Sequence, residues 1–130
     1  MNMIKEISKI ILITVSVFNI GFADKIELKY SDFTHVSSNE IPLITSKQYY
    51  LYYYSPTCYY CQLIEKDVLA FALKMKCVYF IDHSRDDNRC QITDSIPCIS
   101  GTPTLFMIKQ QVIEERLVGA NKIADYIFNN

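Results

Sequence analysis

The sequence predicts a single α/β domain, with a central mixed β-sheet flanked by helices, after an N-terminal signal segment. The chain has 130 residues, of which 50% are hydrophobic, so it can build one core but not two. A strand-forming aromatic run is followed by a helical apolar stripe and a second short apolar run, which is the order of a β-α-β unit. The formal net charge is -1 and the basic residues are scattered, so we expect no nucleic-acid partner.

Residues 1–23 have the pattern of a signal peptide. Two lysines precede an apolar run, and Gly21 and Ala23 form a small-x-small cleavage site. The apolar run is shorter than the roughly 20 residues of a membrane-spanning helix, which favours cleavage after Ala23 over a permanent N-terminal anchor. In both cases residues 24–130 form an extracytoplasmic domain that is periplasmic, secreted or on the outer face of the cell membrane. Membrane contact then comes only from an uncleaved N-terminal segment.

The first elements of the domain are two strands separated by an irregular segment. Residues 25–30 alternate polar and apolar side chains and predict a half-exposed edge strand. Residues 31–40 are rich in Ser, Asp and Asn and predict a loop or a short helix, and Pro42 argues against one continuous element there. The run Gln-Tyr-Tyr-Leu-Tyr-Tyr-Tyr at 48–54 predicts the central strand, covered on both faces.

A helix is predicted from Cys58 to about Lys76. Its apolar residues fall on one helical stripe, at Cys61, Ile64, Val68, Phe71, Ala72 and Met75. Residues 77–81 predict a short buried strand that completes the β-α-β unit, with Cys77 as a small buried hydrophobic residue. The polar stretch that follows is expected to hold a brief helix near 90–94.

The C-terminal part predicts a hairpin and a final helix. The two strands are expected at 104–108 and 112–117, with a turn between them. Gly119 ends the hairpin. Asn121 is predicted to cap a helix whose apolar stripe contains Ile123, Ala124, Ile127 and Phe128.

Five cysteines in a small exported chain indicate disulfide chemistry. The strongest signal among them is the pair Cys58 and Cys61, which forms a Cys-x-x-Cys motif at the start of the predicted helix. Free backbone N–H groups and the helix dipole stabilise an anion at Cys58, so this thiol is predicted to be the more acidic one and to attack. Cys61, one turn further along the buried stripe, is predicted to resolve the mixed disulfide. Gln62 excludes the simple haem-attachment motif. We expect no cofactor and no metal.

The motif order resembles the thioredoxin superfamily over residues 45–130: strand, Ser-Pro-Thr-Cys-Tyr-Tyr-Cys, helix, strand, Gly-Thr-Pro-Thr-Leu-Phe, hairpin, Gly, helix. The resemblance implies a thioredoxin-like fold and a protein-disulfide oxidoreductase that acts on protein thiols and disulfides and is recycled by an unidentified redox partner. Thr102 and Pro103 match the family's cis-proline loop, which faces the active cysteines and binds extended substrate. Gly119 matches a position that borders the substrate groove, which Tyr59 and Tyr60 are expected to line.

The sequence also departs from the family. Many members carry a buried acid six positions before the first cysteine, where this chain has Tyr52. Proton transfer at the second thiol then uses water, a tyrosine hydroxyl or no dedicated group. The dipeptide Tyr59-Tyr60 is none of the family's common pairs, so the direction of electron flow, as oxidase, reductase or isomerase, stays open.

The remaining cysteines and histidines leave alternatives. Cys90 and Cys98 are expected to form a structural disulfide, and a regulatory or relay pair is the alternative. A zinc site would recruit Cys90, Cys98 or His83, but these residues form no second Cys-x-x-Cys knuckle. His35 and His83 show no sequence partners and receive no catalytic role. The competing functions are a zinc- or copper-binding module and a thioredoxin-like accessory domain, both using the same thiols without turnover.

Overall fold

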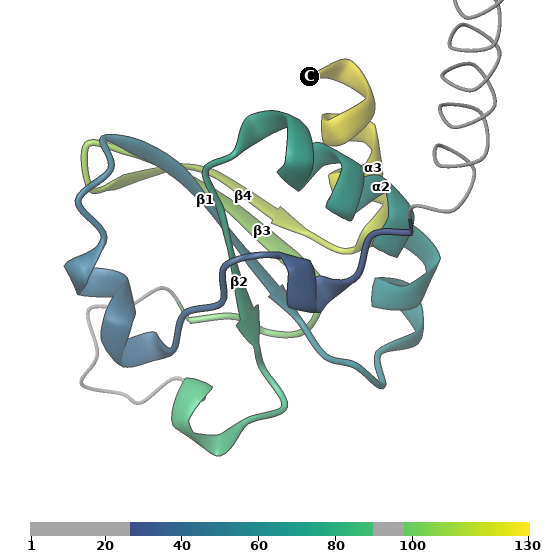
Figure 1. The fold of residues 1–130 in the computed structure, drawn as a ribbon, viewed down its shortest axis with the longest axis horizontal. Coiled ribbons are helices and arrows are strands. Elements are labelled where there is room, and N and C mark those ends of the chain that lie inside the picture. Colours follow the sequence, from purple (N-terminus) through teal and green to yellow (C-terminus); the bar gives the residue numbers. More distant parts are fainter. Residues whose placement is uncertain (1–26, 90–97) are drawn as a thin grey trace, which may run out of the picture.

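The computed structural model describes residues 27–89 and 98–130 (Figure 1). The predicted signal segment and the predicted helix near 90–94 lie outside the described residues. The described elements are η1 (Tyr30–Asp32), η2 (Ser38–Leu43), β1 (Gln48–Tyr54), α2 (Tyr59–Met75), β2 (Val78–Asp82), η3 (Asp86–Asn88), β3 (Thr104–Lys109), β4 (Val112–Val118) and α3 (Ala120–Asn129).

The four strands form one mixed sheet in the order β2-β1-β3-β4. β1 pairs with β2 in parallel and with β3 antiparallel, and β3 pairs antiparallel with β4. The central residue Leu51 lies between Tyr79 of β2 and Phe106 of β3, and it is completely buried. The predicted mixed sheet with flanking helices is therefore confirmed, and β1 has the predicted bounds.

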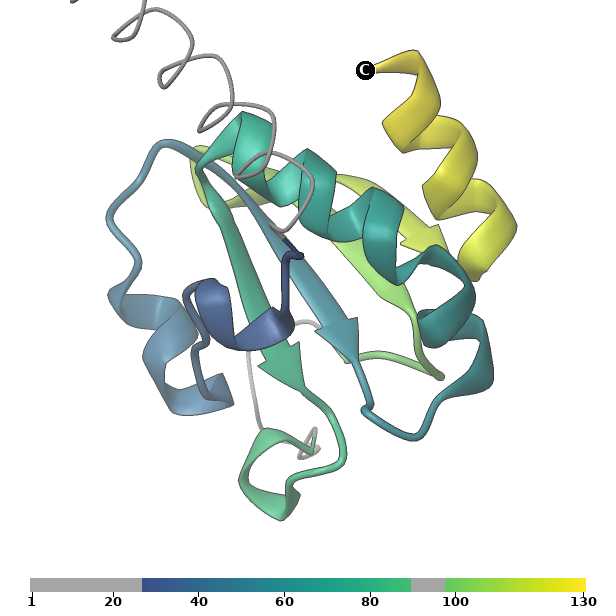
Figure 2. The same cartoon turned by 45° about the vertical axis from the view of Figure 1, so that its right-hand side comes forward.

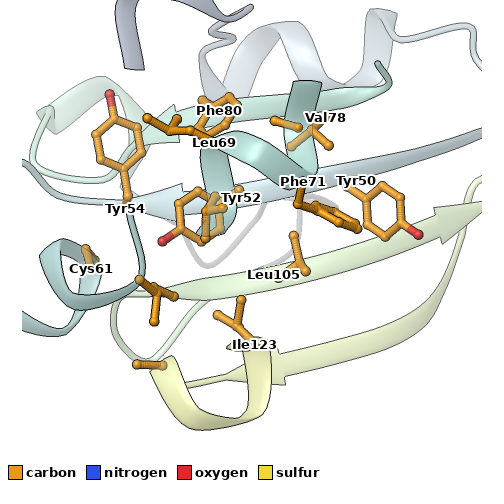
Figure 3. Packing of buried hydrophobic residues seen from close by; sticks show 14 residues of the cluster. Tyr50, Tyr52, Tyr54, Cys61, Leu69, Phe71, Val78, Phe80, Leu105 and Ile123 are labelled. Atoms are coloured by element: carbon orange, nitrogen blue, oxygen red, sulfur yellow. The ribbon is translucent and has the colours of Figure 1, made fainter. Parts of the chain in front are cut away.

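β1 divides the core because successive side chains of a strand point to opposite faces of the sheet. On one face, which we call the helix-covered face, Tyr50, Tyr52 and Tyr54 pack with residues of α2, α3, β2 and β3 (Figure 3). On the other, which we call the opposite face, Tyr49, Leu51 and Tyr53 pack with Ile41, Ile44, Ile81, Phe106 and Ile108. The aromatic run of β1 thus belongs to the core on both faces.

α2 and α3 lie together over the helix-covered face (Figure 2). The predicted stripe of α2 is buried at Cys61, Ile64, Val68, Phe71 and Ala72, while Met75 is half-buried against the same cluster. α2 ends at Met75, and its C-cap Lys76 adopts a left-handed conformation with φ 63° and donates its N–H to Ala72 O. After this turn the chain continues directly into β2, the last strand of the β-α-β unit.

The N-terminal expectation is wrong for the described residues, because residues 27–30 do not form an edge strand. The chain turns instead into η1, where the Asp32 carboxylate accepts the Lys29 N–H at 2.9 Å. Contact with the edge of β2 is made later and by a single bridge, between His35 and Phe80. Pro42 lies inside η2, a 3₁₀ helix with an Ile44 N–H to Ile41 O bond of 3.1 Å. The alternation of polar and apolar side chains at residues 27–30 therefore did not lead to strand pairing with β2.

The C-terminal hairpin forms as predicted and is slightly longer, but the cap of the last helix differs. α3 begins at Ala120, with Gly119 rather than Asn121 as its N-cap. Gly119 has φ 98°, a region that favours glycine, and its N–H donates to Pro103 O at 3.0 Å. The helix starts two residues earlier than the Asn signal indicates because glycine allows the sharp turn out of β4.

Candidate active site

Cys58 occupies the N-cap of α2, at the point where the chain leaves β1 and a short turn. Its backbone is extended, with φ -76° and ψ 117°, and its sulfur accepts the Cys61 N–H at 3.2 Å. The Gln62 amide stabilises this corner by donating to Pro56 O at 3.1 Å. The sulfur therefore lies where the first backbone N–H groups of the helix have no other partner.

The surroundings of Cys58 favour its thiolate. Partial burial of the sulfur opposes ionisation, but bonds from the side chains of Cys61 and Thr102 and from the backbone N–H groups of Cys61 and Tyr60 outweigh it and lower the pKa of Cys58. No lysine or arginine stands at 55–64. The hydrogen bonds around the sulfur, rather than a basic side chain, therefore stabilise the thiolate.

Cys61 is in the opposite situation. Its side chain is only 1% exposed and lies in the core of the helix-covered face. Burial, reinforced by the hydrogen bond with Cys58, raises the pKa of Cys61 to about 11. The two thiols are thus chemically unequal, with Cys58 half-exposed and acidic and Cys61 buried and protonated at neutral pH.

Thr102 and Pro103 lie directly against Cys58. The Cys58 S–H donates to Thr102 O at 3.5 Å, and the peptide bond between Thr102 and Pro103 is cis. The Thr104 hydroxyl donates to Gly101 O at 2.7 Å, which fixes the loop at the start of β3. Two segments that are more than 40 residues apart in the sequence therefore meet at one sulfur atom.

An apolar hollow of about 350 Å³ adjoins this contact. It is lined by Tyr60, Thr102, Pro103, Val118, Gly119, Ala120, Asn121 and Lys122. The side chains of Tyr59 and Tyr60 are 64% and 60% exposed, with their rings edge to face at 5.4 Å. The predicted substrate-binding residues Tyr60, Thr102 and Pro103 thus line one hollow beside the half-exposed thiol, and Tyr59 lies next to it on the surface.

Sequence reasoning missed two contacts at Tyr54, the last residue of β1. Tyr30, expected in a strand, packs from η1 against the helix-covered face, and its ring stacks on Tyr54 at 4.0 Å. His35, for which no partner was expected, bonds through Nε2 to the Tyr54 hydroxyl at 2.7 Å. Both contacts join segments about 20 residues apart through an irregular chain, so no local pattern could have indicated them.

The other predicted cysteine and histidine residues have different surroundings. Cys77 is a free, half-buried thiol beyond the far end of α2, where full burial was expected. Cys98 takes part in a disulfide bond, but Cys90 lies outside the described residues, so their pairing stays a prediction. Nδ1 of His83 is buried without a hydrogen-bond partner in the described part of the chain, and the ring contacts Tyr53.

Over 27–89 and 98–130, no three His, Cys, Asp or Glu side chains are grouped so that they could hold a metal ion. Within the same ranges, no helix combines the length and the apolar character needed to cross a membrane.

Comparison with known proteins gives a structural likeness. No family model and no curated protein matches the chain. Among solved structures, spinach chloroplast thioredoxin f is similar with a TM-score of 0.57 at 18% identity, covering 74% of this chain and 84% of that one. Mitochondrial thioredoxin 3 from Saccharomyces cerevisiae gives 0.55 at 18%, covering 78% and 98%, and a Nicotiana alata thioredoxin gives 0.56 at 22%, covering 74% and 90%. The chain therefore has a thioredoxin-like fold, and its Cys-x-x-Cys motif opens the helix after the central strand.

Proposed function

We propose that this protein is a thiol–disulfide oxidoreductase that exchanges disulfides with protein substrates through Cys58 and Cys61. The observation that carries the proposal is the inequality of the two thiols. Cys58 has a lowered pKa and a half-exposed sulfur at a helix N-terminus, whereas Cys61 is buried with a pKa near 11. An accessible nucleophile with a resolving thiol one helical turn away is what disulfide exchange needs.

The proposed reaction has two steps. The Cys58 thiolate attacks a substrate disulfide, a mixed disulfide forms, and one substrate thiolate leaves. Cys61 then gives up its proton and attacks the Cys58 sulfur, which forms the Cys58–Cys61 disulfide and releases the second substrate thiolate. Two electrons pass from the cysteine pair to the substrate. The reverse sequence oxidises a substrate dithiol, and an external redox partner restores the starting state.

The surface around Cys58 supports a protein substrate. Tyr59 and Tyr60 expose their rings beside the thiol, and an apolar hollow lies between Tyr60 and the start of α3. Aromatic side chains supply large contact areas with little loss of side-chain freedom, which suits the binding of a polypeptide segment around its cysteine.

Two variants test the activity. We expect Cys58→Ala to abolish exchange with a model protein disulfide, because no attacking thiolate remains. Cys61→Ala should accumulate a mixed disulfide on Cys58, detectable as a mass increase equal to the substrate and reversible by dithiothreitol. Cys77→Ala is the control, since this thiol lies at the other end of α2. Unchanged exchange in the Cys58 variant would contradict the proposal.

We also propose that the exchange takes place outside the cytoplasm. The signal-peptide pattern at residues 1–23 supports this location. The disulfide at Cys98 supports it too, because such bonds persist in oxidising compartments. Fractionation of the source cells, with N-terminal sequencing of the recovered protein, tests the proposal. An extracytoplasmic chain beginning at Asp24 is expected, and a cytoplasmic chain beginning at Met1 would overturn it.

A further inference from the structure

Two tyrosine hydroxyls, those of Tyr30 and Tyr52, are buried without a hydrogen bond of regular geometry among the described residues. The Tyr52 side chain is 0% exposed, at the centre of β1. An unpaired buried hydroxyl costs about 1–3 kcal/mol, so a folded protein usually pairs it. These two groups therefore call for an explanation beyond packing.

The unpaired hydroxyls lie close to the active-site thiols. Figure 3 shows the hydroxyl of Tyr52 on the side of its ring that faces Cys61. The hydroxyls of Tyr52 and Tyr30 are close enough to interact with each other, and both interact electrostatically with Cys61. Tyr52 also interacts electrostatically with Cys58. Both rings also contact Phe80, at 5.6 Å for Tyr52 and 5.8 Å for Tyr30. Two donors from different elements thus converge behind the buried thiol.

The two other tyrosines of β1 on the helix-covered face, Tyr50 and Tyr54, have hydroxyls with hydrogen-bond partners. The Tyr50 hydroxyl lies 3.1 Å from that of Tyr126, and the Tyr54 hydroxyl lies 2.7 Å from Nε2 of His35. Three tyrosines therefore point to one face of β1, and within the described residues only the one beside the thiols lacks a hydrogen bond of regular geometry.

We propose that the hydroxyls of Tyr52 and Tyr30 are hydrogen-bond donors for the thiolate that Cys61 carries during exchange. The inference rests on the proposed function, because Cys61 must become a thiolate to attack the Cys58 sulfur of the mixed disulfide. In that step the Cys58–Cys61 bond forms and the Cys58–substrate bond breaks. The leaving substrate thiolate takes up one proton, which balances the proton that Cys61 gives up. Tyr52 keeps its own proton throughout.

Burial explains why Tyr52 acts as a donor rather than as a base. Desolvation, followed by the negative charge that Tyr30 and Cys61 can carry, raises the pKa of Tyr52 far above its ordinary value. A hydroxyl that does not ionise always presents its hydrogen. The titratable groups that face Cys61 are Cys58, Tyr30 and Tyr52, and Glu65 faces Tyr30 from the next turn of α2.

The experiment compares Tyr52→Phe with Tyr50→Phe, which removes a paired hydroxyl from the same face of the same strand. Reduced protein is mixed with an aromatic disulfide that releases one coloured thiolate when Cys58 attacks and a second when Cys61 resolves. We expect Tyr52→Phe to slow the second phase about tenfold or more and to leave the first unchanged, since a hydrogen bond to a charged group is lost. Tyr50→Phe should change neither phase. The Cys58→Ala, Cys61→Ala double variant supplies the background from other thiols.

A second readout separates this role from a structural one. In a Cys58→Ala background, thiolate absorbance measured below pH 10, where the fold is intact, should show a smaller ionised fraction of Cys61, and hence a higher Cys61 pKa, after Tyr52→Phe and no change after Tyr50→Phe. Tyr52→Phe should also keep or increase the free energy of unfolding, because the hydroxyl it removes makes no hydrogen bond of regular geometry with the described residues. If Tyr52→Phe does not fold, Tyr30→Phe takes its place, with a smaller slowing of the second phase expected.

The possible outcomes are distinct. Unchanged resolution and an unchanged Cys61 pKa in the folded variant would overturn the inference while leaving the oxidoreductase proposal intact. Equal effects of Tyr52→Phe and Tyr50→Phe would also overturn it, because they would indicate general loosening of β1. Absence of both phases in the wild-type protein would instead reject the proposed function, and the Cys61 titration would still test the hydrogen bond.

Discussion

The two faces of the sheet are built from one strand but hold different chemistry. The helix-covered face carries Cys61 and three tyrosines whose hydroxyls approach polar groups or thiols. The opposite face carries Leu51, Ile81, Phe106 and Ile108 under η2, a short 3₁₀ helix. The long helices α2 and α3 thus cover the face on which atoms must be positioned, while aliphatic and aromatic packing suffices on the other.

This difference separates the part of the molecule that positions the thiols from the part that mainly stabilises the fold. A 17-residue helix fixes Cys58 at its N-terminus and Cys61 one turn later against β1. Among the described residues, Cys77 is the only thiol that packs against the opposite face, and it is half-buried. The other side chains of that face serve packing alone. We therefore expect mutations on the two faces to separate stability from reactivity.

The largest expected effect is alkaline unfolding, to which both faces contribute. Burial raises the pKa of Tyr53 and of Tyr54 to about 12, and the pKa values of Tyr49, Tyr50 and Tyr52 are raised as well. A raised folded pKa gives stability that is complete below the ordinary tyrosine pKa near 10 and is lost as the pH rises toward the folded value. Each group loses about 1.4 kcal/mol per pH unit in that window.

Circular dichroism against pH measures this transition, with unfolding expected between about pH 10 and pH 12. Tyr52→Phe should move the midpoint to higher pH, and Tyr49→Phe should move it less, because the pKa of Tyr49 is raised less strongly. The same midpoint in wild type and both variants would contradict the role of the buried hydroxyls.

The next largest effect is expected on the opposite face. Phe106 is 0% exposed, contacts Tyr53 at 5.9 Å and lies under the Arg116 guanidinium at 5.6 Å. Phe106→Ala should lower the free energy of unfolding by about 3–5 kcal/mol, since it leaves a cavity in the core. Urea unfolding measures the loss, and Val112→Ala, at an exposed position, is the control. Below the unfolding temperature the rate of Cys58 attack should stay unchanged, and a large change would show that the faces are coupled.

The smallest effect is expected at Cys77, which packs against both clusters. Cys77→Ala removes one half-buried sulfur and should lower the free energy of unfolding by about 1 kcal/mol or less. Neither phase of disulfide exchange should change, because Cys77 follows the far end of α2. A slower second phase in this variant would show that the third thiol takes part in the chemistry.

The sequence predicted the segments in which local pattern and tertiary environment agree. The aromatic run of β1 and the apolar stripe of α2 each indicate by their own pattern which side chains are buried. The predicted bounds of both elements therefore agree with the structure to within one residue. The places of Cys58 and Cys61 at the start of α2 could be predicted as soon as the start of that helix was known. The hairpin β3–β4 followed for the same reason.

The sequence did not predict the segments whose conformation depends on distant contacts. Residues 27–30 alternate like a strand, but the Asp32 carboxylate bends the chain into η1 and brings Tyr30 to the thiols. Asn121 resembled a helix cap, but Gly119 permitted an earlier start. The approach of Tyr30, Tyr52 and Cys61 depends on both the sheet and the irregular N-terminal segment, so no spacing in the sequence encodes it.

The position of β4 has a consequence for self-association. β4 forms an edge of the sheet as described, and Val112, Ile113 and Val118 are exposed along it. An uncovered edge with β-branched side chains is a template for pairing with another chain. Glu114, Glu115 and Arg116 occupy the middle of this strand and keep charge in water there. Pairing with a second molecule at this edge would remove part of the hydration of these charged side chains, so they oppose the growth of the sheet beyond β4.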